Sequence, residues 1–485
     1  MEEKIDFLQR ARNYEETNRI SPEERPAFHV TPPVGWMNDP NGFSIYQGKI
    51  HLFYQYHPYS TEWGPMHWGH QMSEDLVHWQ ECAAALAPDE AYDKEGCFSG
   101  SAIETEEGHV LVYTGVVKDE DSASVRQNQC IAIGDGRDYK KTVKHPVITG
   151  DMLPEGFSRA DFRDPKIWKD EDGYYLVAGN LDEDGNGQIV LFSSANLYQW
   201  KYEGVLAHSE GIIGRMWECP DFFELDGKHI LICSPQDMKA RGYEFHNGNN
   251  AVYFLGDYDK RSKAFSKGNP VSLDYGLDFY APQTTALPDG RRIMIAWMTS
   301  WDDLFIPAGQ KWQGMMTFPR ELSVEHGKLI QRPVRELENY RKNKIFYEKE
   351  ILEGEKCYNG ICGRMIDFTL EIHSGEFHEL TVDVAKNEEC FTRVSVNCDK
   401  KFMEIDRTFS SITRDVACIR RMKLPDCGGG VKFRFIMDRN SVELFVNDGE
   451  MVVSTVIYTP QDAEGICLSC DGSAVISMEK YEIEL

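Results

Sequence analysis

The sequence predicts an all-β fold, a five-bladed β-propeller followed by a C-terminal β-sandwich. Beyond residue 22 the chain consists of short runs of Val, Ile, Tyr, Phe and Trp broken by Gly, Asp and Asn, which is typical of strands and turns. A strand led by glycine recurs at intervals of about 60 residues, a period that indicates propeller blades. These strands begin at Gly48, Gly108, Gly173, Gly227 and Gly290.

Composition limits the classes of function. The 485 residues are 41% hydrophobic and 27% charged, which is ordinary for a globular protein with a sizeable core. The net charge of −27 argues against binding to nucleic acid or to anionic membranes, because both attract basic proteins. No stretch approaches the roughly 18 apolar residues that a membrane span needs. A small neutral ligand is compatible with all of this.

Residues 1–25 are predicted to form a helical N-terminal extension, because Ile5, Leu8 and Ala11 share one helical face. The segment lacks the apolar stretch and the cleavage site of a secretory signal, so we expect a cytoplasmic protein. The 13 cysteines are odd in number, which favours reduced thiols over a disulfide framework. Cys467 and Cys470 form an isolated CxxC without the second pair of a zinc site.

The five repeats place the propeller over residues 26–336. One equivalent position in each repeat predicts where the functional site lies. Counting back nine residues from each leading glycine gives Asp39, Ser99, Asp164, Glu218 and Ala281. If the repeats are equivalent, these side chains lie at one level on the innermost strands and converge on one pocket. They are flanked by aromatic and polar residues, namely Trp36, Asn38, Phe98, Arg163, Trp217 and Tyr280. Acids with aromatic walls are typical of a sugar site.

The C-terminal part has a different pattern. Residues 337–344 are polar and predict a short helical linker, and residues 345–485 predict the sandwich. Within it, the strands 441–446 and 451–456 flank the turn Asn447-Asp-Gly-Glu450, which indicates a hairpin.

Three carboxylates suffice for retaining glycoside hydrolysis, which needs a nucleophile and an acid/base. Asp39 opens a polar turn, Asp39-Pro-Asn-Gly42, whose donors would keep a nucleophile ionised. Glu218 lies between Trp217 and Cys219-Pro220, a less polar setting that favours a protonated acid. Asp164 follows Arg163, whose charge should hold it ionised as a stabiliser of a cationic transition state.

Four blocks resemble, in order and spacing, the signatures of glycoside hydrolase family 32, whose members include invertases, sucrose-6-phosphate hydrolases, inulinases, levanases and some fructosyltransferases. They are Trp36-Met-Asn-Asp-Pro-Asn-Gly42, Phe98-Ser-Gly100, Arg163-Asp-Pro165 and Glu218-Cys219. The resemblance extends over nearly the whole chain and includes Tyr280-Ala-Pro-Gln283, the segment 312–322 and the sandwich. Met315-Met316 departs from it, since the family often has a small residue there.

The resemblance implies a role for each matching residue. Asp39 would be the nucleophile, Asp164 the transition-state stabiliser and Glu218 the acid/base. The substrate-binding residues would be Trp36, Asn38, Gln55, Trp63, Phe98, Ser99, Arg163, Tyr280 and Trp297. The N-terminal segment, with Arg25-Pro26 before the first block, resembles that of intracellular bacterial sucrose or sucrose-6-phosphate hydrolases.

We therefore expect a retaining β-fructofuranosidase that acts on sucrose, sucrose 6-phosphate or short fructo-oligosaccharides, with no metal and no organic cofactor. A fructosyltransferase would use the same carboxylates with a sugar acceptor. An inverting five-bladed hydrolase of arabinan or xylan and a non-catalytic sugar-binding propeller are further alternatives. The substrate, exo or endo action and the formation of a homo-oligomer stay open.

Other residues have simpler interpretations. Cys219 is expected to be a buried bystander, because no histidine is placed to activate it. A group of histidines is expected to pack and hydrogen-bond rather than to bind a metal. These are His51, His57, His67, His70 and His78. The basic loop Lys239-Ala-Arg-Gly242 is either solvated or in contact with a substrate phosphate.

Overall fold

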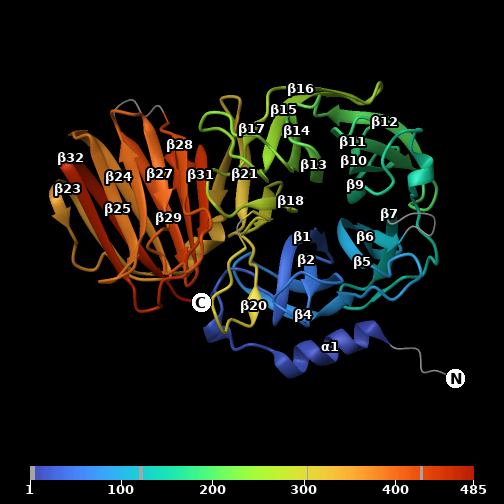
Figure 1. The fold of residues 1–485 in the computed structure, drawn as a ribbon, viewed down its shortest axis with the longest axis horizontal. Coiled ribbons are helices and arrows are strands. Elements are labelled where there is room, and N and C mark those ends of the chain that lie inside the picture. The colour runs from blue at the N-terminus through green and yellow to red at the C-terminus, as the bar shows by residue number, and fades with distance from the viewer. Residues whose placement is uncertain (1–5, 119–123, 303, 426–429) are drawn as a thin grey trace.

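The computed structural model describes residues 6–118, 124–302, 304–425 and 430–485. Strands dominate it and form five sheets of four or five strands around one axis, beside one ten-stranded sheet (Figure 1). The predicted all-β fold of a five-bladed propeller and a C-terminal sandwich is confirmed.

The five blades repeat one order of strands. The first strands are β1 (Gly35–Tyr46), β5 (Gly96–Thr105), β9 (Phe162–Asp170), β13 (Trp217–Leu225) and β18 (Tyr280–Ala286). The second strands, which the glycines predicted, are β2 (Lys49–His57), β6 (Gly108–Lys118), β10 (Gly173–Leu181), β14 (Lys228–Pro235) and β19 (Arg292–Trp297). The outer strands are β3 (His67–Ser73), β4 (Trp79–Leu86), β7 (Val125–Gly134), β8 (Tyr139–Lys140), β11 (Gly187–Ser194), β12 (Trp200–His208), β15 (Val252–Asp259), β16 (Ala264–Lys267), β17 (Val271–Ser272), β21 (Arg320–Glu325) and β22 (Lys328–Pro333).

The first strands contact one another in sequence around the axis, and β18 contacts β1 to complete the ring. The short strand β20 (Trp312–Gln313) returns from the fifth blade and pairs in parallel with the start of β1. This pairing ties the last blade to the first. Each blade can therefore bury its faces against two neighbours.

A single α-helix occurs in the described residues, α1 (Phe7–Asn18), and it packs on β4 of the first blade. Ala11 is fully buried there, and the buried Glu15 accepts a hydrogen bond from the backbone N–H of Ala84 at 2.9 Å. Residues 1–5 of the predicted helical extension, Ile5 included, lie outside the described residues.

The sandwich follows the short 3₁₀ helix η3 (Arg335–Tyr340). Its strands are β23 (Arg341–Lys356), β24 (Ile366–Glu376), β25 (Glu379–Lys386), β26 (Thr392–Asn397), β27 (Phe402–Asp406), β28 (Ile419–Lys423), β29 (Val431–Asp438), β30 (Ser441–Val446), β31 (Met451–Val456) and β32 (Gly465–Ile483). Nine of these strands are hydrogen-bonded in the order β28-β27-β26-β25-β32-β24-β29-β30-β31, and β23 pairs with β32. Their buried apolar side chains form one core. The predicted hairpin of β30 and β31 is confirmed. Strand β23 begins inside the range predicted for the linker, and the division of the chain into domains stays a prediction.

The prediction of reduced thiols holds for ten of the described cysteines and is wrong for one pair. Cys357 and Cys467 form a disulfide between the end of β23 and β32, with their Cα atoms 4.4 Å apart. The two strands pair so that Lys356 lies opposite Leu468, which brings together two cysteines separated by 110 positions. Sequence spacing does not reveal such a pairing. Cys470 of the CxxC is a free, buried thiol.

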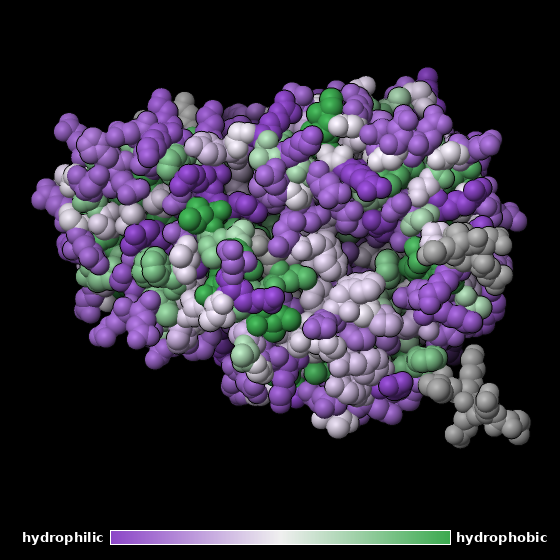
Figure 2. All heavy atoms as spheres, viewed as in Figure 1, coloured by the Kyte–Doolittle hydropathy of each residue, from purple (hydrophilic) through white to green (hydrophobic). Residues whose placement is uncertain are grey.

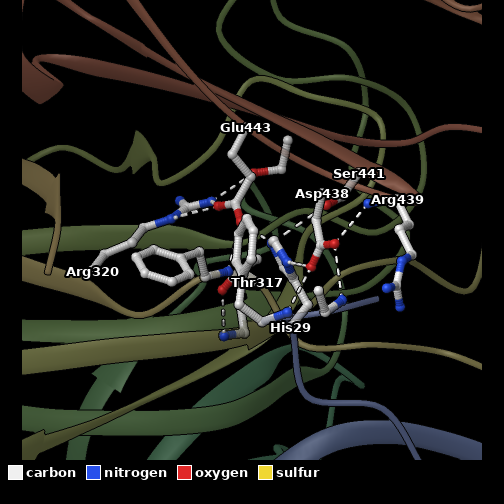
Figure 3. A network of polar contacts seen from close by, with 12 residues as sticks. His29, Thr317, Arg320, Asp438, Arg439, Ser441 and Glu443 are labelled. Carbon is white, nitrogen blue, oxygen red and sulfur yellow. Dashed lines mark hydrogen bonds and ion pairs between the residues drawn. The ribbon is translucent and has the colours of Figure 1, made fainter. Parts of the chain in front are cut away.

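A network of buried charged side chains joins the sandwich to the propeller (Figure 3). His29, which precedes β1, places Nδ1 2.9 Å from Asp438 Oδ2 and Nε2 3.0 Å from Glu443 Oε1. Arg320 of β21 donates from Nη2 to Glu443 Oε2 at 2.7 Å. All four side chains are inaccessible to solvent. Removing one member would leave a buried charge without its partner, so the network specifies how the two domains dock.

Hydrophilic residues cover most of the face shown in Figure 2, in agreement with the net charge of −27. Within the described ranges, no helix has the length and apolar character that crossing a membrane requires.

His29 should make stability depend on pH. Burial opposes its charge, but the hydrogen bonds and charges of Asp438 and Glu443 raise the pKa of His29 to about 9. An unfolded histidine has a pKa of about 6.5, so this stabilisation is complete below pH 6.5 and is lost as the pH rises through 9. We expect the free energy of unfolding to fall by up to about 3 kcal/mol between pH 6.5 and 9.

The measurement is denaturant unfolding at both pH values. His29→Gln should be less stable at pH 6.5 and should lack most of the fall. His145→Gln, at an exposed histidine, serves as the control and should behave like the wild type. A fall of the same size in His29→Gln would contradict this account.

Candidate active site

A cavity of about 530 Å³ lies among the first strands of the propeller. Eight of the predicted residues line it, namely Asn38, Asp39, Gln55, Trp63, Phe98, Arg163, Asp164 and Glu218. Seven lining residues were not predicted, namely Ser124, Val125, Gln127, Ala160, Asp161, Gln236 and Trp301. The structure therefore brings the three acids of the sequence motifs into one cavity.

Each first strand is interrupted by a bulge at the same level. The register shifts fall between Met37 and Pro40, Phe98 and Gly100, Arg163 and Lys166, Glu218 and Asp221, and Tyr280 and Gln283. Within three of them a residue other than glycine adopts a left-handed conformation, with φ of 64° at Asp164, 47° at Cys219 and 52° at Ala281. Bulges re-aim side chains, and strain of this kind is typical of functional sites.

The bulges correct the predicted equivalence in the fourth blade. Glu218 is the last paired residue before its bulge, like Arg163 and Tyr280 in the neighbouring blades. Cys219, with its positive φ, is the true counterpart of Asp164. By the same criterion the first blade is also displaced, because Met37 is its last paired residue and Asn38, rather than Asp39, is the counterpart of Asp164.

Asp39 of β1 is held by three side chains. Ser99 Oγ donates to its Oδ2 at 2.6 Å, Asn38 Nδ2 to its Oδ1 at 3.1 Å, and Cys219 Sγ lies 3.5 Å from Oδ2. Trp36 Nε1 donates to Asn38 Oδ1 at 2.8 Å and so fixes the amide. Burial raises the pKa of Asp39, whereas the hydrogen bond from Ser99 lowers it. These donors keep the carboxylate oriented and favour its ionised form.

Asp164 of β9 is less ionised than the sequence suggested. Burial, followed by the charge of Glu218, raises its pKa to about 7, and the charge of Arg163 opposes this only in part. Arg163 lowers the pKa of Asp164 in the expected direction, but its guanidinium is hydrogen-bonded to Glu218 and does not outweigh the effect of burial. Asp164 Oδ2 accepts from the backbone N–H of Cys219 at 2.9 Å and lies 3.6 Å from its Sγ.

Glu218 of β13 is surrounded by polar groups, not by the less polar setting that we expected. Arg163 Nε donates to its Oε1 at 2.9 Å, and the Tyr280 hydroxyl donates to its Oε2 at 2.7 Å. Burial lowers the pKa of Arg163, but the charges of Glu218 and Asp164 raise the pKa of Arg163 by more. The two donors fix the orientation of the Glu218 carboxyl group in the cavity.

Cys219 was expected to be a bystander, and the structure places it in contact with Asp39 and Asp164. Burial, followed by the charges of these carboxylates, raises the pKa of its thiol well above the usual value. The thiol is therefore a neutral neighbour of both acids and not a nucleophile. The sequence contains a signal for the place of Cys219. Cys219-Pro220 repeats the pattern of Asp164-Pro165, but lies one residue nearer to the leading glycine of its blade.

Aromatic rings close one side of the cavity. Trp301 stacks on Trp36 with ring centroids 6.0 Å apart and lies 5.0 Å from Trp297. Trp63 is 49% exposed and meets Phe98 edge-on at 6.0 Å. Trp301 was missed because it lies in a loop between strands, where only the aromatic residue itself gives a signal.

The remaining predicted binding residues lie outside the lining. Trp36, Ser99, Tyr280 and Trp297 are buried and act on the cavity through their neighbours. Met315 and Met316 are also buried and do not line it. The basic loop at Lys239 is exposed and likewise does not contribute to the lining.

Two other features do not form a catalytic site. His51 Nδ1 lies 3.0 Å from His70 Nε2, and in the described parts of the chain no group of His, Cys, Asp or Glu side chains could hold a metal ion. A larger cavity of about 1240 Å³ lies against the sandwich, but its Glu244 carboxylate already accepts hydrogen bonds from Ser272 and Tyr275. The convergent acids, rather than size, single out the smaller cavity.

Comparison with known proteins agrees with this geometry. The N-terminal domain of glycosyl hydrolases family 32 matches residues 29–333, and the C-terminal domain of the same family matches residues 336–483. The chain belongs to glycoside hydrolase family 32. It is therefore an enzyme, a glycoside hydrolase of the β-fructofuranosidase type, and the resemblance seen in the sequence is confirmed.

Curated relatives and a solved structure cover nearly the whole family 32 chain. A raffinose invertase of Escherichia coli is 38% identical over 457 residues, 93% of each chain. A sucrose-6-phosphate hydrolase of Escherichia coli is 37% identical over 462 residues, again 93% of each. The structure of a Bombyx mori family 32 β-fructofuranosidase superposes with a TM-score of 0.86 at 32% identity, over 98% of both chains.

Removal of the Ser99 hydroxyl should change the pH dependence of this family 32 enzyme. Ser99→Ala removes the hydrogen bond that favours ionised Asp39, so the pKa of Asp39 should rise. The acidic limb of the kcat/KM profile for fructoside hydrolysis should move upward by about one pH unit. Ser262→Ala, at an exposed serine hydrogen-bonded to Asp259, is the control. An acidic limb that stays in place would disprove the role of this bond.

Proposed function

We propose that this enzyme hydrolyses the β-fructosyl bond of sucrose, sucrose 6-phosphate or short fructo-oligosaccharides, with retention and through a covalent fructosyl–enzyme intermediate. The observation that carries the proposal is the convergence of Asp39, Asp164 and Glu218 on one cavity. The names of the relatives support the substrate class, and one similar Bombyx mori structure holds sucrose.

In the first step, Glu218 protonates the glycosidic oxygen while Asp39 attacks C2 of the fructosyl unit. Ser99 and Asn38 orient the Asp39 carboxylate for this attack. Tyr280 fixes the Glu218 carboxyl group through its hydroxyl. In the second step Glu218 deprotonates a water molecule, which attacks C2 and releases fructose and Asp39.

Asp164 stabilises the oxocarbenium-like transition state by accepting hydrogen bonds from ring hydroxyls. Its carboxylate is oriented by the backbone N–H of Cys219, which donates to Oδ2. The lining residues Asn38, Gln55, Trp63, Phe98 and Arg163 would contact the sugar directly. Trp36, Ser99, Tyr280 and Trp297 would hold these groups from behind. The carboxylates supply both covalent and proton-transfer catalysis, so this scheme uses no metal or organic cofactor.

Substrate choice depends on how the cavity treats a phosphate. Arg163 is the one cation among the described lining residues, and Glu218 and Asp161 already engage it. Comparing kcat/KM for sucrose and for sucrose 6-phosphate tests whether the enzyme favours the phosphorylated substrate. A tenfold gain from the phosphate, about 1.4 kcal/mol, would require a basic group at the mouth such as Lys239 or Arg241. Oligosaccharides in excess of free fructose at high sucrose would favour a transferase.

Asp39→Asn should abolish fructose release from sucrose while the fold survives. We expect kcat to fall by roughly 10³-fold or more, because the amide cannot form the intermediate. The melting temperature should stay the same or rise, since one member of a crowded acid cluster becomes neutral. Asp170→Asn, at an outer ion pair with Lys260, is the matched control. Activity of the wild-type order in Asp39→Asn would refute the mechanism.

The loss of activity in Glu218→Gln should depend on the leaving group of the substrate. Loss of the acid should slow sucrose hydrolysis strongly but slow a nitrophenyl β-fructofuranoside much less, because nitrophenolate leaves without protonation. The measurement is the ratio of kcat/KM for the two substrates in the variant and in the wild type. Equal losses on both substrates would remove Glu218 from the acid role.

A cytoplasmic location and the division into domains stay predictions from the sequence, and the oligomeric state stays open.

A further inference from the structure

A second set of polar groups crosses between the blades directly beyond the bulges. Gly100 N donates to Asn41 Oδ1 at 3.1 Å, Gln283 Nε2 donates to Gly100 O at 3.0 Å, and Ser101 Oγ donates to Pro165 O at 2.7 Å. The first strands belong to five separate sheets and do not pair with one another, so such side chains set their spacing.

One of these links is an ion pair between Lys166 and Asp221. Lys166 Nζ lies 3.0 Å from Asp221 Oδ2, with side chains 12% and 1% exposed. The same Nζ donates to Thr284 O at 2.6 Å, and Thr284 N donates to Asp221 Oδ2 at 2.7 Å. The pair therefore clamps β9, β13 and β18 around one point.

The position of the pair relates it to the acids. Lys166 lies two residues after Asp164 in β9, and Asp221 lies three residues after Glu218 in β13, so each follows the bulge that carries its acid. Within the described residues, the other polar links between β9 and β13 are made by Asp164 and Glu218 themselves, to Cys219 and Arg163. Those links involve Arg163, Asp164 and Glu218, which line the cavity, whereas Lys166 and Asp221 do not line it.

We propose that Lys166 and Asp221 are a positioning pair, which fixes the separation of Asp164 and Glu218 for the chemical step. This inference rests on the proposed function. Neither residue touches the substrate cavity, so both act through the strands that carry the acids. A shift of about 1 Å in a catalytic group can cost roughly a hundredfold in rate, which makes the spacing of these strands critical.

The charges themselves argue for more than stability. A buried ion pair is weak evidence for stabilisation, because an apolar pair of similar volume often stabilises as well. Asp221 Oδ1 has no hydrogen-bond partner in the described protein, so the carboxylate relies on Lys166, on one backbone N–H and on the charge of the nearby Arg292. The pair instead provides directional contacts to three strands, which apolar side chains would not supply.

Asp221→Asn tests the proposal, because the amide keeps the shape but removes the charge. We expect kcat on sucrose to fall about tenfold to a hundredfold while KM changes less than about threefold. Kinetics on a nitrophenyl β-fructofuranoside provide the second readout. Its loss should be at least about fivefold smaller, since proton transfer from a displaced Glu218 matters only for sucrose.

The double variant Lys166→Met/Asp221→Asn separates position from stability, because neither member of the ion pair keeps a charge without the other. All rates refer to the folded fraction measured by tryptophan fluorescence. We expect kcat on sucrose to remain low in the double variant. A kcat restored to the wild-type value would overturn the proposal, and so would equal losses on both substrates in Asp221→Asn.

Lys260→Met is the matched control, since Lys260 makes an exposed ion pair with Asp170 of β9. It should behave like the wild type on both substrates. If the wild type itself releases no fructose from either substrate, the proposed function fails. If the wild type is active and Asp221→Asn is indistinguishable from it, only the positioning role is overturned.

Discussion

The burial of three carboxylates in one cavity is the constraint on which the rest of the structure depends. Asp39, Asp164 and Glu218 would repel one another if all were ionised, and burial raises the pKa of Asp39 and Asp164. The protein offsets this with donors directed at each acid, from Ser99, from the Cys219 backbone and from the Arg163 guanidinium. The resulting site keeps each carboxylate in a defined orientation.

The propeller supplies the geometry that this constraint demands. A bulge at the same level of each first strand directs one residue inward, and three of these positions need a left-handed backbone. Such strain persists only when the surroundings hold it. Cross-blade contacts such as Lys166–Asp221 hold it from beneath, and the pairing of β20 with β1 keeps the ring closed. The buried network around His29 and Glu443 braces the first and fifth blades against the sandwich.

The sequence predicts the repeated parts of this structure well, because each blade needs the same turn and strand. The glycine-led strands mark all five second strands, and the motifs identify residues that line the cavity. What escapes prediction depends on contacts between distant residues. The fourth blade is one residue out of phase, so the contact of Cys219 with two of the acids was not expected, and Arg163 faces Glu218 rather than its neighbour Asp164. The Cys357–Cys467 disulfide forms only when β23 lies along β32.

The central claim is that Asp39 carries the fructosyl group between the two steps. Hydrolysis of sucrose in dilute methanol tests it most directly, because methyl fructosides do not change their anomeric form after they are made. NMR of the methyl fructoside should show only the β-furanoside, the result of two inversions at C2. Formation of the α-anomer would mean a single displacement by the acceptor, and the assignment of Asp39 as a nucleophile would then be wrong.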